Sequence, residues 1–445
     1  MIWHSKRCTV IAVTLSLALL FGLSACRTSE SDEEEDKFSG PDQSFTFNRR
    51  AEMQEQEQKK AERKKMANLF KKARDGNTSA QVELGQLYFN GHEFLKQDRQ
   101  EAAEWFKRAA EKGNPSGQFN YAICLDTGRG VEKDPEAAFE WYRKAAGAGV
   151  LPAQLNTALT YESRKEFGRA LKYYALAARQ GHVDATRTVA EYFEQGKGTN
   201  KNLKRAVQYY RQAAEAGDAR AQVKMAGFYR SGTIVPQDYT RMLSYLWLAA
   251  GQGDPEALAK IGWAYQYGVG VNKNASEAFS WFERAAKGGY APAQVAVGNA
   301  CLQGDGVDKA PQKALKWFRQ AAKQQNASAM FSLGAAYSLG NGVERDPVKA
   351  FEWFKKAAGE KHPEAMYNLG HFYKQGIGTA QDPQKAVKWF RRASAFDDPR
   401  ALYALGKAYL QGEGIPENKT KAGFYLRKAA KLGADEALQL LKEEF

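Results

Sequence analysis

A block of aromatic, basic and alanine residues recurs along this chain at a fixed spacing, and this repetition constrains the fold more than any other feature. Trp281, Trp317 and Trp353 each open a Trp-Phe-x-x-Ala-Ala block, and successive blocks are 36 residues apart. A period of this length is typical of stacked helical units that cannot bury an apolar face alone. With boundaries after the Gly that usually follows the block, the chain contains ten units, numbered here as repeats 1 to 10: 77–113, 114–149, 150–181, 182–217, 218–253, 254–289, 290–325, 326–361, 362–397 and 398–433.

Each unit has the pattern of two helices joined by a turn. In repeat 8, small and apolar residues fall at helical spacing in both halves, as expected of two amphipathic helices. Between the halves, Gly340-Asn341-Gly342-Val343 predicts a turn, and Asp346-Pro347 predicts the start of the second helix. Repeat 3 is shorter by about four residues, and the loss falls where its neighbours carry the Gly-rich turn.

The repeated pattern resembles that of the Sel1-like repeat family, which is related to tetratricopeptide repeats. The shared motif is A-x-x-x-L-G-x-x-Y-x-x-G-x-G-V, followed by K-A-x-x-W-F-x-x-A-A-x-x-G, over residues 77–433. The resemblance implies an all-α fold: a right-handed α/α superhelical solenoid of about ten 36-residue helix-turn-helix repeats. We expect a charged helix at 49–76 to lead into this array and a helix at 434–445 to cap it.

The N-terminal residues have the pattern of an export signal. Lys6 and Arg7 precede an apolar run of about 14 residues, at 10–23, which is too short to span a bilayer comfortably. The run ends in Leu23-Ser24-Ala25-Cys26, which resembles the bacterial lipobox and implies a signal peptide at 1–25 and a lipid on Cys26. An ordinary cleaved signal and an uncleaved anchor are the alternatives. Because Arg27 rather than Asp follows Cys26, the resemblance favours the outer membrane.

Charge is unevenly distributed along the chain. Residues 26–48 contain the acidic run 32–36 and predict an acidic, flexible tether. The whole chain has a net charge of +14, which becomes +12 without 1–25, because that segment contains Lys6 and Arg7 but no Asp or Glu. The repeats are therefore basic, which favours acidic peptides or protein faces, phospholipid headgroups, or anionic glycopolymers such as peptidoglycan as partners. We do not expect nucleic acid as a partner.

The chemistry-bearing residues do not form a catalytic or metal-binding pattern. Seven units contain Gly-x-Gly, but each follows a helix rather than the strand that a phosphate-binding loop requires. No two of the histidines after His4 have i, i+4 spacing, and Cys124 and Cys301 take positions that are inward in other repeats. The dense Trp and Tyr residues recur with the repeat, which favours a place in the core. We predict no catalytic residue, no metal and no cofactor.

One position of the first helix varies in polarity while the motif around it is constant. It precedes the Leu-Gly pair and holds Asn120, Asn156, Lys224, Lys260 and Asn368 in five repeats. Asn both donates and accepts hydrogen bonds, and Lys pairs with carboxylates. In related tetratricopeptide repeats the matching residues bind peptides on the concave face. By that resemblance these five residues, together with His371 three positions after Asn368, are the predicted partner-binding residues.

These features together predict a membrane-anchored repeat lipoprotein of the bacterial envelope, facing the periplasm or the cell surface. Its expected role is a scaffold or adaptor that binds other proteins on the concave face of the solenoid. One alternative is a protein that binds or hydrolyses peptidoglycan or β-lactams, as is linked to cysteine-rich relatives, although this chain lacks their paired cysteines. Another is a surface-exposed factor that binds a host protein.

Overall fold

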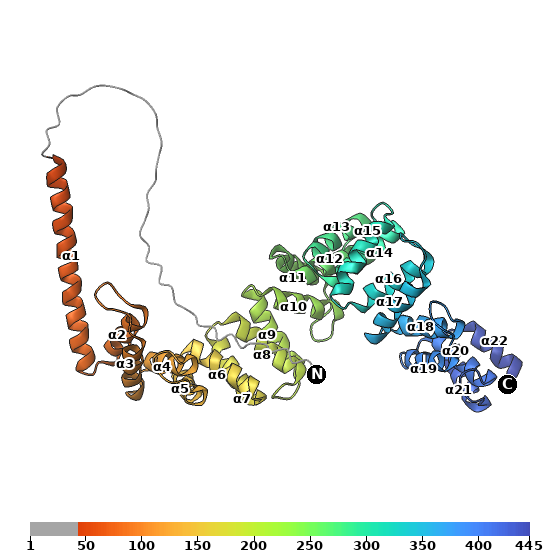
Figure 1. Ribbon diagram of the computed structural model, residues 1–445, viewed down its shortest axis with the longest axis horizontal. Coiled ribbons are helices and arrows are strands. Elements are labelled where there is room, and N and C mark those ends of the chain that lie inside the picture. Colours follow the sequence, from red (N-terminus) through yellow and green to blue (C-terminus); the bar gives the residue numbers. More distant parts are fainter. Residues whose placement is uncertain (1–42) are drawn as a thin grey trace, which may run out of the picture. The chain divides into compact units, whose positions relative to one another are not determined.

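The computed structural model describes residues 43–445, and this part of the chain consists of helices and short connections (Figure 1). It falls into two compact units, which meet between Tyr209 and Tyr210. The helices that begin in the first unit are α1 (Gln43–Arg74), α2 (Thr78–Asn90), α3 (Arg99–Glu111), α4 (Pro115–Thr127), α5 (Pro135–Gly147), α6 (Leu151–Ser163), α7 (Phe167–Arg179), α8 (Val183–Gln195) and α9 (Leu203–Glu215).

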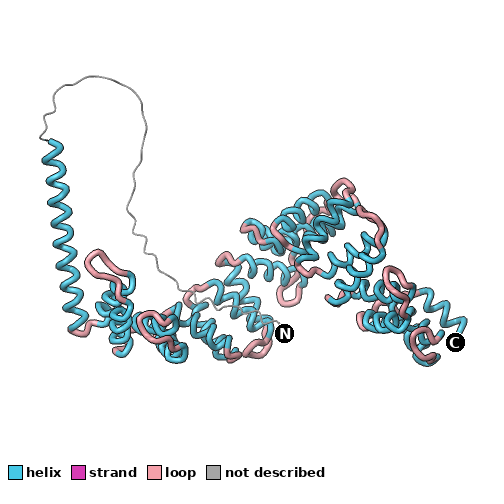
Figure 2. Tube along the Cα trace, viewed as in Figure 1, coloured by secondary structure: helices cyan, strands magenta, loops and turns pink. Residues whose placement is uncertain are grey.

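The second unit continues the same alternation of first and second helices (Figure 2). Its helices are α10 (Ala219–Ser231), α11 (Tyr239–Gly251), α12 (Pro255–Tyr267), α13 (Ala275–Lys287), α14 (Ala291–Gln303), α15 (Pro311–Lys323), α16 (Ala327–Leu339), α17 (Pro347–Gly359), α18 (Pro363–Gln375), α19 (Pro383–Ser394), α20 (Pro399–Gln411), α21 (Lys419–Lys431) and α22 (Asp435–Glu444). The predicted all-α solenoid of helix pairs is confirmed. Between residues 43 and 445, no helix is both long and apolar enough to cross a membrane.

The helix pairs begin where the sequence predicts. The Asp346 side chain accepts a hydrogen bond from the Lys349 backbone N–H, 2.9 Å away, and Pro347 occupies the first turn of α17. Such a cap satisfies a backbone donor that has no partner within the helix. In repeat 3, the short connection leaves two helices, α6 and α7, as predicted.

The Leu-Gly pair of the first helix lies against the Phe of the Trp-Phe block in the same repeat. In repeat 8, a Cβ atom added to Gly334 would lie 2.7 Å from Cδ1 of Phe354, which is only 2% exposed. Any side chain at residue 334 would therefore displace the ring. Gly is required here by close approach of the two helices rather than by backbone conformation, and the Phe ring fills the core of the pair.

The second glycine of the Gly-x-Gly turn joins one repeat to the one before it. Gly342 has a φ of 76°, and a Cβ there would lie 2.8 Å from the carbonyl carbon of Pro311, at the start of α15. A positive φ and a close backbone contact both favour Gly. These glycines are turn residues, as predicted, and they also form the junction between repeats.

Repeat 3 lacks this glycine, and a charged contact occupies the equivalent place. Arg164 lies in the short connection after α6, and its Nη2 atom donates to both carboxylate oxygens of Glu136 in α5, at 2.7 Å. The same guanidinium lies 4.4 Å from the centre of the Phe139 ring. At the junction between repeats 2 and 3, an ion pair on an aromatic ring therefore takes the place of the turn-glycine contact, beside the apolar packing of α5 on α6.

Helices outside the repeats lie at the two ends of the described chain. α1 begins at Gln43, so the last residues of the predicted tether, 43–48, are helical. α22 follows repeat 10, and its Ala437 is buried in a cluster with Leu402 and Leu426. Signal peptide residues 1–25 and the predicted lipid attachment site Cys26 lie outside the described residues.

Candidate partner-binding groove

One position of the first helix changes greatly in size between neighbouring repeats of the second unit. The residue directly after the Leu-Gly pair is Gly227 in α10, Trp263 in α12 and Asn299 in α14. The indole of Trp263 thus stands between two much smaller side chains. Neighbours of this size leave empty space on both sides of the ring.

Two hollows occupy this space, and Trp263 and Tyr267 line both of them. The larger has a volume of about 420 Å³ and extends over α12, α13 and α14 to the first residues of α16. The smaller, of about 100 Å³, lies between α10 and α12. We call the two hollows together the α12 groove. Tyr267 is 70% exposed at its edge, so an aromatic surface is open to a partner.

Gly227 has no packing role that explains it. A Cβ at Gly227 would meet no atom within 4 Å, in contrast to Gly262 in α12, where a Cβ would lie 2.7 Å from Cδ1 of Phe282. A glycine inside a helix costs about 0.5–1 kcal/mol relative to alanine. No close contact within the fold offsets this cost at Gly227, which is consistent with a surface kept open for another molecule.

The polar lining of the α12 groove differs between the two hollows. Arg230 and Lys260 line the smaller hollow, and Lys260 Nζ lies 3.2 Å from Glu256 Oε1. The larger hollow is lined at its polar edge by Asn299, Gln303 and Asp305. The smaller hollow thus combines apolar walls with two cations, while the larger combines aromatic walls with amide groups and one carboxylate. This combination suits an extended peptide that carries an apolar side chain next to an acidic one.

A family comparison matches the repeats along almost the whole described chain. The model of the Sel1 repeat matches ten segments: 78–114, 115–150, 153–182, 184–218, 219–254, 255–290, 291–326, 327–362, 363–395 and 399–433. This chain belongs to the Sel1 repeat family.

Two solved structures give the Sel1 assignment further support. The first is a protective antigen present in uropathogenic Escherichia coli strains, which displays an SLR fold; it is 31% identical, with a TM-score of 0.65 over 85% of this chain and 81% of that one. The second is a Sel1 repeat protein from Oxalobacter formigenes, which is 30% identical, with a TM-score of 0.52 over 54% of this chain and 99% of that one. No curated protein sequence matches. Sel1 repeat proteins are protein-interaction scaffolds.

The structure places the predicted partner-binding residues on several Sel1 repeats rather than at one site. Asn120 in α4 is half-buried, and Asn156 in α6 is only 9% exposed, the least accessible of the six. In the second unit, exposed Lys224 has its ammonium 5.8 Å from the centre of the Tyr210 ring. Lys260 is the one predicted residue that lines the α12 groove.

Asn368 and His371 form a separate location on α18. Both are half-buried, and the His371 ring lies 6.5 Å from that of Tyr367, with the planes inclined by 20°. Burial and the nearby Lys374 lower the pKa of His371 below its ordinary value of 6.5. A neutral imidazole both donates and accepts hydrogen bonds, so this pair is suited to amide groups rather than to carboxylates.

Sequence reasoning missed Trp263 and Tyr267, although a signal was present. Trp residues were assigned to the core because they recur every 36 residues in the second helices, but Trp263 lies on a first helix and has no counterpart 36 residues on, where Asn299 stands. Its size relative to Gly227 and Asn299 was visible in the aligned repeats. What the alignment does not show is that the space beside it stays open.

The remaining histidine and cysteine side chains, which could in principle act in catalysis or metal binding, have structural roles. His182 and His362 are helix N-caps, whose Nδ1 atoms accept from the backbone N–H of Ala185 and Ala365. Cys124 and Cys301 are buried free thiols, as predicted, and burial raises the pKa of Cys124 to about 11. Residues 43–445 contain no group of three or more His, Cys, Asp or Glu side chains placed to hold a metal ion.

Proposed function

We propose that this Sel1 repeat protein is a lipid-anchored adaptor of the bacterial envelope that binds a partner protein in the α12 groove. The observation that carries the proposal is Trp263, which stands between open space beside Gly227 and open space beside Asn299. An aromatic ring with space on both sides can anchor an extended segment, as aromatic residues in pockets do at protein interfaces.

The partner segment is an extended peptide with one apolar side chain. That side chain enters the larger hollow between Trp263 and Phe279, which both line it. An acidic residue of the same segment meets Arg230 and Lys260 in the smaller hollow. Pairing with Lys260 has to compete with its contact to Glu256, 3.2 Å away, so Arg230 contributes more of the attraction.

The anchor is proposed on the N-terminal pattern. Cys26 is the attachment site, and the lipid holds the repeats close to the membrane, where the search for a partner is confined to a surface. Cys26→Ala in the full-length chain should abolish incorporation of a labelled fatty acid and release the protein from the membrane fraction. A variant that is still labelled and retained would contradict the anchor while leaving the groove untouched.

The groove is tested by photo-crosslinking from the full-length chain in its native envelope. A photoreactive amino acid replaces Tyr267, which is 70% exposed at the end of α12, and the matched control replaces Leu339, which is 71% exposed at the same position of α16. A partner captured only from residue 267 supports the groove. That partner should be lost in Trp263→Ala and kept in Trp247→Ala, an exposed tryptophan of a second helix. Equal capture from residues 267 and 339, or capture that persists in Trp263→Ala, would refute the proposal.

A further inference from the structure

The second helices of the last four repeats carry a regular pattern of positive charge. Counted from the first residue of each helix, the third and ninth positions hold Lys or Arg in all of α15, α17, α19 and α21: Lys313, Arg319, Lys349, Lys355, Lys385, Arg391, Lys421 and Arg427. The sixth position adds Lys316 and Lys388. Residues three apart lie on one side of a helix. All ten side chains are exposed, and we call them the basic face.

Acidic residues are nearly absent from these four helices. They contain four, three, four and five Lys or Arg residues respectively, against a single acidic residue, Glu352. Among the earlier second helices, α9 has Arg205 and Arg211 at these positions, but α3 has Glu101 at the third, and α13 has Glu277 at the third and Glu283 at the ninth. The repeat fold therefore does not require a cation at either position, and the unbroken run of four such second helices lies at this end of the array.

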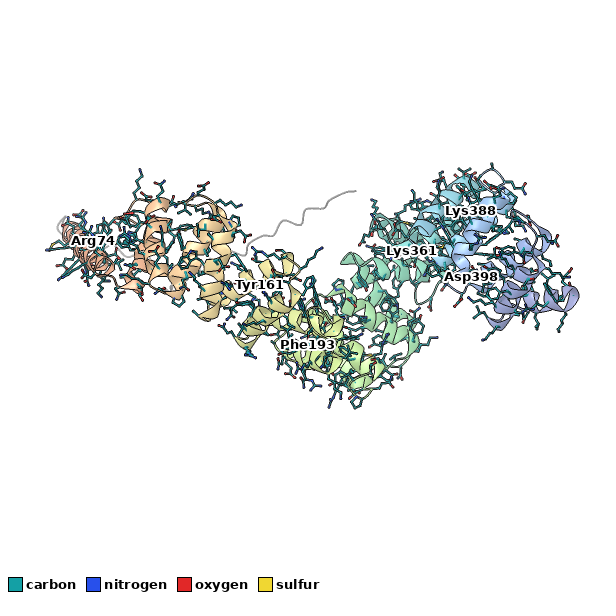
Figure 3. The ribbon with its side chains drawn as sticks, turned by 90° about the horizontal axis from the view of Figure 1, so that it is seen from below. Arg74, Tyr161, Phe193, Lys361, Lys388 and Asp398 are labelled. Carbon is teal, nitrogen blue, oxygen red and sulfur yellow. The ribbon has the colours of Figure 1, made fainter. Side chains whose placement is uncertain are left out.

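Part of the basic face makes no ion pair. Lys349 and Lys385 contact the N-cap carboxylates of their own helices, at 3.0 and 2.9 Å. Among residues 43–445, by contrast, Lys316, Arg319 and Lys388 have no ion pair with a carboxylate. Figure 3 labels Lys388 on α19. Exposed cations in this number repel one another at low ionic strength, and an anionic surface removes that repulsion.

Apolar side chains stand among these cations. Phe424 is 59% exposed at the sixth position of α21, where α15 and α19 carry Lys316 and Lys388. Phe396 and Leu432, just after α19 and α21, are 50% and 44% exposed. Large exposed side chains next to Lys and Arg are typical of surfaces that lie at the boundary between lipid headgroups and acyl chains.

We propose that the basic face binds the surface of an anionic phospholipid bilayer. Lipid headgroups present a diffuse layer of negative charge, which suits cations repeated along four helices without a fixed set of acceptors. The side chains of Phe424, Phe396 and Leu432 enter the headgroup region of the bilayer. An acidic protein partner, by contrast, would have to supply matching apolar pockets for them. This surface is made by second helices, whereas the α12 groove is lined mainly by first helices, so binding to lipid leaves the groove available.

The test compares two charge-reversed variants of the full-length chain in vesicle co-sedimentation. The test variant is Lys316→Glu, Arg319→Glu, Lys388→Glu; the control is Lys133→Glu, Lys172→Glu, Arg179→Glu, three exposed cations of the first unit. Both variants change the net charge equally and keep the same N-terminal segment, so its own affinity for lipid cancels. On vesicles of phosphatidylglycerol and phosphatidylcholine, the test variant should bind about tenfold or more weakly than the control.

Further measurements separate the possible outcomes. On vesicles of phosphatidylcholine alone, the two variants should bind equally, and added salt should remove the difference on anionic vesicles. Phe424→Ser alone should weaken binding to anionic vesicles without changing its salt dependence. Equal binding of the two variants to anionic vesicles, with helical circular dichroism intact, would overturn the proposal. So would a loss of binding to an acidic protein or to nucleic acid that leaves vesicle binding unchanged.

Discussion

In repeats 6 to 9, a glycine of the first helix faces a phenyl ring of the second, whereas repeats 2 and 3 hold alanine and tyrosine at the same positions. Gly334 and Phe354 represent the first arrangement, and Ala158 and Tyr174 the second. The preceding residue follows the same division: Leu333 and its counterparts are fully buried and apolar, but repeat 3 buries Thr157 there. One backbone thus accepts an apolar core in repeats 6 to 9, and in repeat 1 with Gly85 and Phe106, and a partly polar core in repeats 2 and 3.

The polar core of repeats 2 and 3 creates hydrogen-bonding demands that the Gly and Phe positions of repeats 6 to 9 do not have. Tyr174 donates to Glu162 Oε2 at 2.8 Å, and Lys197 Nζ lies 2.5 Å from Glu162 Oε1. The hydroxyl of Thr157, however, is buried without a partner, and that of Tyr142 is buried near Asn156 and Asp126 without a hydrogen bond of normal geometry. Within the described chain, every buried side-chain polar atom without a partner lies in the first unit. We infer that packing stabilises the second unit, while the first depends more on its polar contacts.

The strongest test of this comparison removes the ring from an apolar repeat. Phe354→Ala should reduce the free energy of unfolding by about 3–5 kcal/mol, because it leaves a cavity next to Gly334 that the helices cannot close. Urea denaturation followed by circular dichroism measures the loss, and hydrogen exchange should localise it to repeat 8 and its neighbours. A loss below about 1 kcal/mol would show that the ring is not the main packing element of the pair.

A second test exchanges the small residue. Gly334→Ala should reduce the free energy of unfolding by about 1–3 kcal/mol, because the new methyl would stand 2.7 Å from the Phe354 ring. Ala158→Gly is the reciprocal change in the first unit, and it should cost about 0.5–1 kcal/mol, through backbone entropy. If the Gly334→Ala variant is as stable as the native chain in urea, close approach does not explain the glycine.

A third test separates a satisfied hydroxyl from an unsatisfied one. Tyr174→Phe should cost about 1–2 kcal/mol, because Glu162 loses a hydrogen bond. Tyr142→Phe should cost less than that, because its buried hydroxyl has the side chains of Asn156 and Asp126 nearby but makes no hydrogen bond of normal geometry. Thermal unfolding of the two variants side by side checks the difference. The opposite ranking would mean that Tyr142 contributes a polar contact and Tyr174 does not.

The smallest expected effect is a difference in pH dependence between the units. Burial lowers the pKa of His362 and His371 in the second unit below 6.5. A depressed folded-state pKa means that their contribution is complete above 6.5 and is lost as the pH falls below it, by about 1 kcal/mol or less for each. In the first unit, burial raises the pKa of Glu162, but hydrogen bonds from Lys197 and Tyr174 outweigh burial and hold it below 4.5. Its contribution should therefore persist until the pH falls below 4.5.

Hydrogen exchange at several pH values can resolve the two units in one sample. Peptides of α18 should lose protection as the pH falls below 6.5, while peptides of α6 should not change until the pH is below 4.5. His362→Asn keeps an N-cap residue and should flatten the first of these transitions. Loss of protection at the same pH in α6 and α18 would contradict the comparison.

The sequence was sufficient to predict the repeats because their signals are local and repeated. These signals are the helical spacing of apolar residues, N-caps such as Asp346 and turn glycines such as Gly342. Each acts within a few residues, and its recurrence in the ten repeats makes the prediction of helix pairs secure. The site was harder to predict because it depends on differences between copies. Lys260 was identified by its polarity, but the space around Trp263 exists only because Gly227 and Asn299, about one repeat away on either side, are small. The hollows result from small residues in the neighbouring repeats, so no single residue in the sequence indicates them.

The contact between Arg164 and Glu136 has a mechanical consequence. When a stack of repeats is pulled at its ends, every junction carries the same tension, and the weakest one opens first. Most junctions in the described chain seat a turn glycine on backbone, but the one between repeats 2 and 3 adds an exposed ion pair to its apolar packing, and salt weakens that pair. We therefore expect the force that separates α5 from α6 to fall as ionic strength rises, whereas the force that opens a glycine junction should not change.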